Sequence, residues 1–220
     1  MSKDFFTVKK QIEVEMEERK SIFICNIKRV INEEEAMNFI NEIKTKYKDA
    51  THNVYAYITN NGISMRYSDD GEPQGTAGPP VLEVLKRENL NNVAVVVTRY
   101  FGGILLGAGG LVRAYSASCK QGVDAAGKVK ESEAVVFQLT CDYEKYGKIN
   151  NYLTKRNIII KNTEFTEVVT MEIMAFYDEF QKIRQDLIEM LNGNDIINIK
   201  EENVTCFVDE EGKIMEVPSW

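Results

Sequence analysis

The sequence has little of what metal-centred and disulfide-stabilised proteins depend on. Its 220 residues include one histidine, His52, and four cysteines that are scattered without a CxxC pair. A single imidazole excludes most transition-metal sites and any mechanism that needs two imidazoles. The cysteine spacing fits neither a disulfide framework nor a zinc-ligand set, so we expect buried or incidental thiols in a reducing compartment.

Long apolar runs and a secretory leader are also missing. The longest aliphatic run near the middle of the chain, residues 93–97, is far shorter than the roughly 20 residues that cross a bilayer. The first residues lack the apolar stretch and the small-residue cleavage site of a signal peptide. We therefore expect a cytoplasmic protein without a membrane-spanning segment.

The net charge of −7 is unevenly distributed along the chain. Residues 1–132 contain 18 Lys and Arg against 17 Asp and Glu, whereas residues 133–220 contain 9 against 17. The acidity therefore belongs to the second part, which could serve as a docking surface for a protein partner. The nearly neutral first part could still carry a basic face for nucleic acid.

Hydrophobic periodicity predicts two domains, at 1–132 and 133–208, followed by a short polar tail at 209–220. The first domain mixes strands and helices and is therefore α/β in the broad sense. We expect strands at 6–16 and 21–30, a helix capped by Asn32, strands at 53–59 and 63–67, a helix at 81–90, a strand at 93–98 and a helix at 109–126.

The second domain shows a different order, βαββαβ, which is typical of ferredoxin-like folds. The expected elements are strands at 135–141, 158–165, 168–177 and 196–208, with helices at 143–156 and 178–191. Apolar residues recur at helical spacing in the second helix and alternate along the third strand. Both periods suit one sheet face packed under helices.

Three carboxylates lie close together in the loop 68–80, which is dense in Asp, Gly and Pro. Asp69, Asp70 and Glu72 could hold a hard divalent cation or perform acid/base chemistry. The alternative is a solvated turn in which Asp side chains and Thr76 cap the next helix. Capping needs only one or two such residues, so an excess of carboxylates is left to explain.

A second cluster is a glycine-rich connection between a strand and a helix, flanked by Arg99 and Arg113. Such a turn directs backbone N–H groups outward at a helix N-terminus and favours a phosphate or carboxylate. Ala108 stands where a P-loop needs lysine, and Val112 takes the last glycine position of a dinucleotide fingerprint, so ATP and NAD are disfavoured. The alternative is close packing of the helix on the sheet. The glycines are Gly102, Gly103, Gly107, Gly109 and Gly110.

The third cluster is the segment 51–57, Thr-His-Asn-Val-Tyr-Ala-Tyr. His52 could act as a general base or donate to a phosphate, and the two tyrosines share a strand face where nucleobases could stack. Aromatic residues at this spacing are also common in the core of a sheet, and that alternative stays open.

These strings carry a resemblance to a known family. Residues 50–57, 68–80 and 97–115 closely resemble the signature of the YigZ/IMPACT family, and the likeness covers about residues 17–127. It implies a ribosomal-protein domain-2-like fold for the first domain, similar to domain IV of elongation factor G. The second domain is similar to the last domain of that factor. Both relatives act on RNA in the ribosome, and eukaryotic family members regulate translation.

The resemblance also implies that the three clusters line one site. Arg66, Arg99 and Arg113 would contact phosphate, the glycine turn would add N–H donors, and Tyr100 or Phe101 could stack on a base. The loop carboxylates would order the arginines or hold a cation.

Three functional hypotheses follow. The first is a regulator linked to translation that binds RNA or the ribosome, with no cofactor. The second is a metal-assisted phosphoester enzyme that uses the acidic loop, residues 69–72, and His52. The third is a protein-interaction module with the acidic second domain as its docking surface. The sequence leaves the oligomeric state open.

Overall fold

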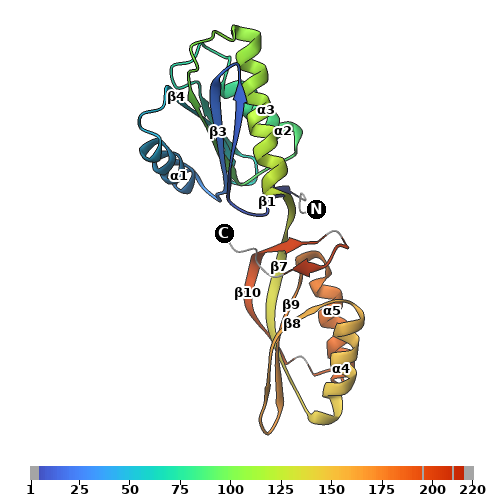
Figure 1. The fold of residues 1–220 in the computed structure, drawn as a ribbon. Coiled ribbons are helices and arrows are strands. Elements are labelled where there is room, and N and C mark those ends of the chain that lie inside the picture. The colour runs from blue at the N-terminus through green and yellow to red at the C-terminus, as the bar shows by residue number, and fades with distance from the viewer. Residues whose placement is uncertain (1–4, 195, 210, 216–220) are drawn as a thin grey trace. The chain divides into compact units, whose positions relative to one another are not determined.

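The computed structural model describes residues 5–194, 196–209 and 211–215. Its internal contacts divide these residues into a first unit, residues 5–129, and a second unit, residues 130–215 (Figure 1). Within the described residues, no helix is long and apolar enough to cross a membrane.

The first unit, residues 5–129, is built from a five-stranded sheet and three helices, α1, α2 and α3, with the short strand β1 outside that sheet. Its central sheet has the strand order β2-β3-β6-β4-β5, in which every neighbouring pair is antiparallel. In chain order the elements are β1 (Phe5–Val8), β2 (Ile12–Glu18), β3 (Ser21–Arg29), α1 (Glu33–Lys46), β4 (His52–Thr59), β5 (Ser64–Ser68), α2 (Gly78–Arg87), β6 (Val93–Tyr100) and α3 (Ala108–Ala126).

Helices cover both faces of this sheet, α1 on one side and α2 with α3 on the other (Figure 1). This explains the unbroken aliphatic run in β6. Val95 and Val97 belong to the core under α2 and α3, whereas Ala94 and Val96 pack with the residues of α1. A strand that is buried on both faces has no polar side to show to water.

Helix α1 begins as the sequence predicts. The side chain of Asn32 accepts a hydrogen bond from the Glu35 backbone N–H at 2.8 Å, and the Glu35 carboxylate accepts one from the Ile31 N–H at 3.0 Å. These bonds satisfy donors that a helix leaves free at its N-terminus, and the acidic first turn suits the helix dipole.

Helix α2 begins at Gly78, three residues earlier than the periodicity predicts. The prediction placed Pro79 and Pro80 in a loop, but proline is tolerated in the first helical turn because its missing N–H would have no intrahelical partner there. The residue before the helix, Ala77, offers no side-chain cap. The cap comes instead from Asp69, eight residues upstream of Ala77.

The second unit has the ferredoxin-like order predicted from the sequence. The sheet order β11-β10-β7-β9-β8 places the first and third strands of the βαββαβ unit at its centre. Its elements are β7 (Lys128–Cys141), which starts at the junction of the units, α4 (Tyr143–Lys155), β8 (Ile159–Phe165), β9 (Val169–Phe176), α5 (Tyr177–Met190), β10 (Ile197–Val208) and β11 (Ile214–Met215).

The core of the second unit lies between one sheet face and the two helices α4 and α5. Along β9 every second residue is buried, and Phe180, Ile183 and Leu187 of α5 pack against them. Strand β7 begins seven residues before the expected start, and pairing with β10 accounts for its extension as far as Lys130. The short strand β11 then pairs with β10, within the segment expected to be a polar tail.

Candidate functional site

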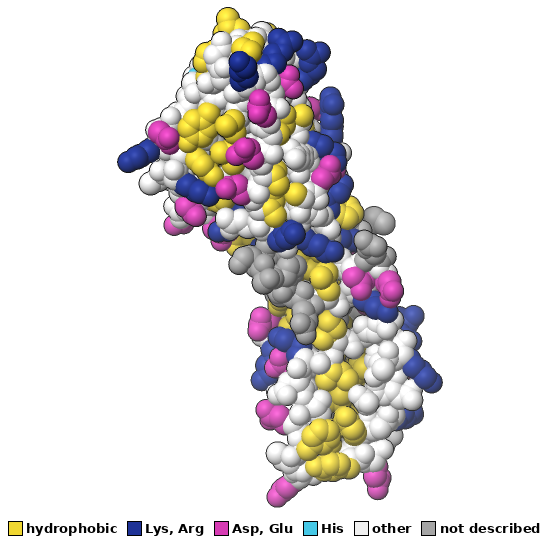
Figure 2. All heavy atoms as spheres, in the orientation of Figure 1, with side chains coloured by type: hydrophobic (Ala, Val, Ile, Leu, Met, Phe, Trp, Pro, Cys, Tyr) yellow, Lys and Arg dark blue, Asp and Glu magenta, His cyan; other side chains and the backbone are white. Residues whose placement is uncertain are grey.

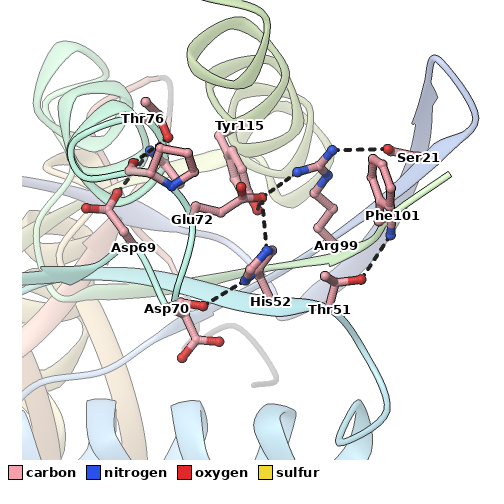
Figure 3. Close-up of polar contacts among 12 residues, drawn as sticks. Ser21, Thr51, His52, Asp69, Asp70, Glu72, Thr76, Arg99, Phe101 and Tyr115 are labelled. Atoms are coloured by element: carbon pink, nitrogen blue, oxygen red, sulfur yellow. Dashed lines mark hydrogen bonds and ion pairs between the residues drawn. The ribbon is translucent and has the colours of Figure 1, made fainter. Parts of the chain in front are cut away.

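A buried ion pair lies at the centre of the candidate site in the first unit. Arg99, near the end of β6, donates from Nη1 to Glu72 Oε1 at 2.7 Å, and the two side chains are 6% and 3% exposed (Figure 3). A charge removed from water to this degree is tolerated only when its partner and further hydrogen bonds are well placed. The acidic loop and the end of β6 are therefore fixed to one another.

Two further contacts hold the Arg99 guanidinium. Nη2 donates to the hydroxyl of Ser21, the first residue of β3, at 3.3 Å. The guanidinium carbon lies 5.5 Å from the ring centroids of Phe23 and Phe101, within the range of a cation–π contact. Arginine at this position thus connects three segments that are distant in sequence.

Helix α3 contributes Tyr115 to the same carboxylate. The buried Tyr115 hydroxyl donates to Glu72 Oε1 at 2.8 Å (Figure 3). Burial raises the pKa of Tyr115 well above its ordinary value, and the negative charge of Glu72 raises it further. Tyr115 therefore stays a neutral donor to the Glu72 carboxylate.

His52 lies at the edge of this network and contacts it through both ring nitrogens. Nδ1 is 2.8 Å from the carbonyl oxygen of Asp70, and Nε2 is 3.8 Å from Glu72 Oε1 (Figure 3). A carbonyl oxygen only accepts, so Nδ1 carries a proton. The imidazole is 19% exposed, which leaves it accessible from the surface at one side.

The other two loop carboxylates bind protein groups of their own. Asp69 accepts from the backbone N–H groups of Ala77 at 3.0 Å, Gly78 at 2.8 Å and Gly75 at 2.9 Å, and so caps α2. Thr76, expected to take part in capping, donates its hydroxyl to the Pro73 carbonyl oxygen at 2.6 Å. These bonds fix the path of the loop.

Asp70 points toward α1 rather than toward Asp69. It accepts from Lys44 Nζ at 2.6 Å and from the Asn53 backbone N–H at 2.6 Å. Its own backbone has a φ of +46°, a conformation that Asp adopts more readily than most residues. The three acidic side chains thus have three separate sets of protein partners.

Among the described residues, no group of three or more His, Cys, Asp or Glu side chains is arranged to hold a metal ion. The divalent cation at Asp69, Asp70 and Glu72 stays a prediction from the sequence. What the geometry shows for Glu72 is the other role expected of the acidic loop, the ordering of an arginine.

Residues 101–107, which connect β6 to α3 just after the ion-paired Arg99, are partly apolar and include exposed side chains. Phe101 and Ile104 are 45% and 41% exposed, and Leu105 is 82% exposed. The Phe101 backbone N–H donates to the Thr51 hydroxyl at 3.0 Å, which anchors the start of this connection. Figure 2 shows apolar and Lys or Arg side chains together at this end of the first unit, where α3 begins.

The glycines of the connection have different roles. A Cβ on Gly102 would lie 1.9 Å from the Lys20 carbonyl oxygen, so the backbone here contacts the β2–β3 turn directly. Gly103 and Gly107 have φ values of +81° and +70°, which glycine adopts at little cost. Gly109 has open space where a side chain would lie, while the Cβ of Leu106 lies 3.0 Å from that position on Gly110.

Arg113 lies on α3 beside a pocket of about 240 Å³. The pocket brings together the start of α3 and the turn between β2 and β3, because both Arg113 and Arg19 line it. Glu18 lines it as well, and its carboxylate is 4.0 Å from Arg19 Nε. The remaining lining residues are Met16, Leu106, Gly110, Ala114 and Ala117.

Two predicted site residues lie apart from this constellation. Tyr100 follows Arg99 on β6 and points to the opposite sheet face, where its hydroxyl donates to Asp49 at 3.0 Å. Arg66 lies on β5, 64% exposed, with Nη2 3.8 Å from a Glu33 oxygen. The structure therefore brings together His52, Glu72, Arg99 and the glycine connection, but not every arginine of the resemblance.

Sequence reasoning assigned no role to Ser21, Phe23 or Tyr115. Ser21 and Phe23 are separated from Arg99 by more than seventy residues, and only the pairing of β3 with β6 brings them together. Tyr115 could have been found, because it is one helical turn from Leu111 and three further turns of α3 continue the same buried stripe.

The comparisons with known proteins cover both units. The model of the Impact N-terminal domain matches residues 19–123, and a domain of unknown function, DUF1949, matches residues 139–194. A curated protein described as IMPACT family member YvyE, from Bacillus subtilis (strain 168), is 41% identical over 206 residues, which are 93% of this chain and 94% of that protein.

Two further likenesses differ in extent. IMPACT family member YigZ from Escherichia coli (strain K12) is 31% identical over 158 residues, which are 70% of this chain and 78% of that protein. A crystal structure described only as that of a hypothetical protein has a TM-score of 0.60 and 27% identity, and the match covers 92% of this chain and all of the other.

Proposed function

Because this chain belongs to the IMPACT family, we propose that it has a role linked to translation and that it binds RNA, free or within the ribosome. The binding surface would be the end of the first unit where α3 begins. The resemblance of both units to RNA-contacting domains of elongation factor G supports this choice of ligand.

The observation that carries the proposal is the convergence of Arg19 and Arg113 on one pocket beside the glycine connection. Two exposed guanidinium groups, one in the β2–β3 turn and one in the second turn of α3, provide positive charge for phosphate. The exposed ring of Phe101 would give a base a surface to stack on.

In this proposal the buried residues act as support. Arg99 is almost fully buried and bound to Glu72, so it holds Phe101 and the acidic loop in place rather than contacting phosphate itself. His52 is bound through Nδ1 to the Asp70 carbonyl oxygen, so it too holds the acidic loop in place. Arg66 lies elsewhere and is not required.

The test is a salt series with the full chain and a fluorescent single-stranded polyuridylate, followed by anisotropy. We expect binding that weakens steeply with salt, and Arg113→Ala should reduce the slope of log affinity against log salt by about 1. Phe101→Ala should cost about 1–3 kcal/mol of binding free energy with little change of slope. Ribosome co-sedimentation at low salt is the parallel assay.

The matched control is Arg87→Ala, which removes an exposed arginine near the C-terminal end of α2. It should leave both affinity and slope unchanged. The proposal fails if the wild-type chain binds neither the oligonucleotide nor ribosomes at low salt, or if Arg87→Ala weakens binding as much as Arg113→Ala does.

A further inference from the structure

The two edges of the central sheet in the first unit differ in how they are protected. At one edge, β2 presents Glu13, Glu15 and Glu17 to solvent on one face, while its apolar residues pack under α3 on the other. Charged residues on an edge strand discourage pairing with another chain. The β2 edge is therefore protected against pairing with a strand of another chain.

The opposite edge, β5, exposes apolar side chains at alternate positions. On β5 itself Met65 is 44% exposed and Tyr67 51%, and Ile63, in the turn just before the strand, is 87% exposed. Within the described chain β4 is the neighbouring strand of β5, so the outer side of β5 keeps backbone N–H and C=O groups directed away from the sheet. An apolar edge with free backbone groups is a template for an added strand.

The side chains of β5 are sorted between the two sheet faces. Met65 and Tyr67 lie opposite Ile58 and Ala56 of β4, on the face covered by α2 and α3. Arg66 lies opposite Tyr57, on the face covered by α1. On that second face the Ser64 hydroxyl donates to Glu33, the carboxylate that also faces Arg66.

The side chains of β5 are arranged so that two copies of the strand can pair with complementary groups opposite one another. When a second β5 is placed antiparallel about a two-fold axis at Met65, the two Met65 residues face each other, Ser64 lies opposite Arg66, and Tyr67 extends toward the turn that holds Ile63 of the other copy. The apolar side chains then meet on one face. On the other face each Arg66 lies opposite the Ser64 that binds the other copy's Glu33, so positive and negative groups face each other across the axis.

A strand pairing shifted so that the two-fold axis passes through the next residue, Arg66, is unfavourable. With the axis at Arg66, the two guanidinium groups would lie directly opposite one another, and like charges in that position destabilise a strand pair. The Met65-centred register is therefore favoured over the Arg66-centred one.

We propose that β5 is a self-association edge, through which a second copy of this chain extends the five-stranded sheet across a two-fold axis. A five-residue strand edge is small compared with the interface of a stable dimer. The association is accordingly weak and depends on concentration. It does not involve the surface proposed for RNA.

Sedimentation velocity of the full chain, from low micromolar to near-millimolar concentration, tests this. Wild-type protein should shift from monomer toward dimer as concentration rises. Met65→Lys places two ammonium groups across the axis, and Met65→Glu places two carboxylates there, so each variant alone should dimerise at least about tenfold more weakly. An equimolar mixture of the two variants should recover association, because lysine then faces glutamate.

The control is Glu15→Lys on the opposite edge, which should leave the dimer unchanged. Thermal melting monitors folding of each variant, and recovery in the mixture shows that both Met65 variants are folded. A single monomeric species at every concentration, or a dimer that persists unchanged in Met65→Lys, overturns the proposal. Either result leaves the RNA-binding proposal standing, since the anisotropy assay is independent of it.

Discussion

The two units differ in what they bury. Among the described residues, twelve of the thirteen buried polar or charged side chains lie in the first unit, and only Glu131 lies in the second. The core of the second unit is a set of aliphatic and aromatic residues between one sheet face and two helices. The first unit has a comparable apolar core but also contains the Arg99–Glu72 network.

The buried polar side chains of the first unit fix the positions of particular segments, and their burial has a cost in stability. A polar group in an apolar interior costs free energy unless each of its hydrogen bonds is made. The first unit meets this requirement for Glu72 with two donors from two different elements, Arg99 of β6 and Tyr115 of α3. The second unit, with Glu131 as its one buried charged residue among those described, is stabilised mainly by apolar packing.

The largest expected effect comes from breaking the buried ion pair. Glu72→Ala leaves the Arg99 guanidinium buried without its partner and should lower the free energy of unfolding by about 3–5 kcal/mol. Hydrogen exchange read by mass spectrometry should show lost protection in β6 and the acidic loop, with the second unit unaffected. Glu72→Gln, which keeps an acceptor in place, should lose less. If both units lost hydrogen-exchange protection equally, the buried ion pair would not be specific to the stability of the first unit.

An effect of intermediate size should be shared by both units, because both bury cysteines. Burial raises the pKa of Cys25 to about 12 and that of Cys206 to about 11. Below pH 9 both states keep these protons, but above it the unfolded chain releases them while the folded chain does not, so stability falls as pH rises. At about pH 10.5 each thiol should contribute about 2 kcal/mol to this loss.

Urea unfolding at about pH 8 and about pH 10.5 measures the alkaline loss. Cys25→Ala and Cys206→Ala should each reduce the difference between the two pH values, whatever their effect at pH 8. A difference that stays the same as wild type in Cys25→Ala would show that this thiol is not protected by burial.

The smallest expected effect is at the cap of α2. Asp69→Asn keeps one acceptor oxygen for the helix but replaces the other, which binds the Gly75 N–H, with a donor. The loss should be about 1 kcal/mol, typical of a weakened cap, measured as a shift of the unfolding midpoint. Asp124→Asn, on the exposed last part of α3, is the matched control and should change the midpoint by less than half as much.

Local signals in the sequence predicted most of the fold. The Asn32 cap, the alternation along β9 and the stripe on α5 are short-range patterns, and each led to the right element. The start of α2 was missed because its cap comes from Asp69, beyond the range of local capping rules. The early start of β7 was missed because it depends on pairing with β10.

The candidate site was predictable in composition but not in arrangement. The family resemblance implied that the segments of His52, Glu72 and Arg99 line one site, and in the structure these three side chains lie in contact. The sequence could not show that Arg99 is buried, because burial follows from the pairing of β3, β6 and β4 and not from nearby residues. Nor could it show that Arg19, within a charged turn, shares a pocket with Arg113.

The close approach of Gly102 to Lys20 has a mechanical consequence. The two backbones touch with no side chain between them, and the Ser21 hydroxyl accepts hydrogen bonds from both Gly102 N–H and Arg99. A side chain at position 102 would collide with the Lys20 carbonyl group, so only glycine allows the β2–β3 turn and the connection to α3 to lie this close. The distance between these two segments is therefore set by direct backbone contact.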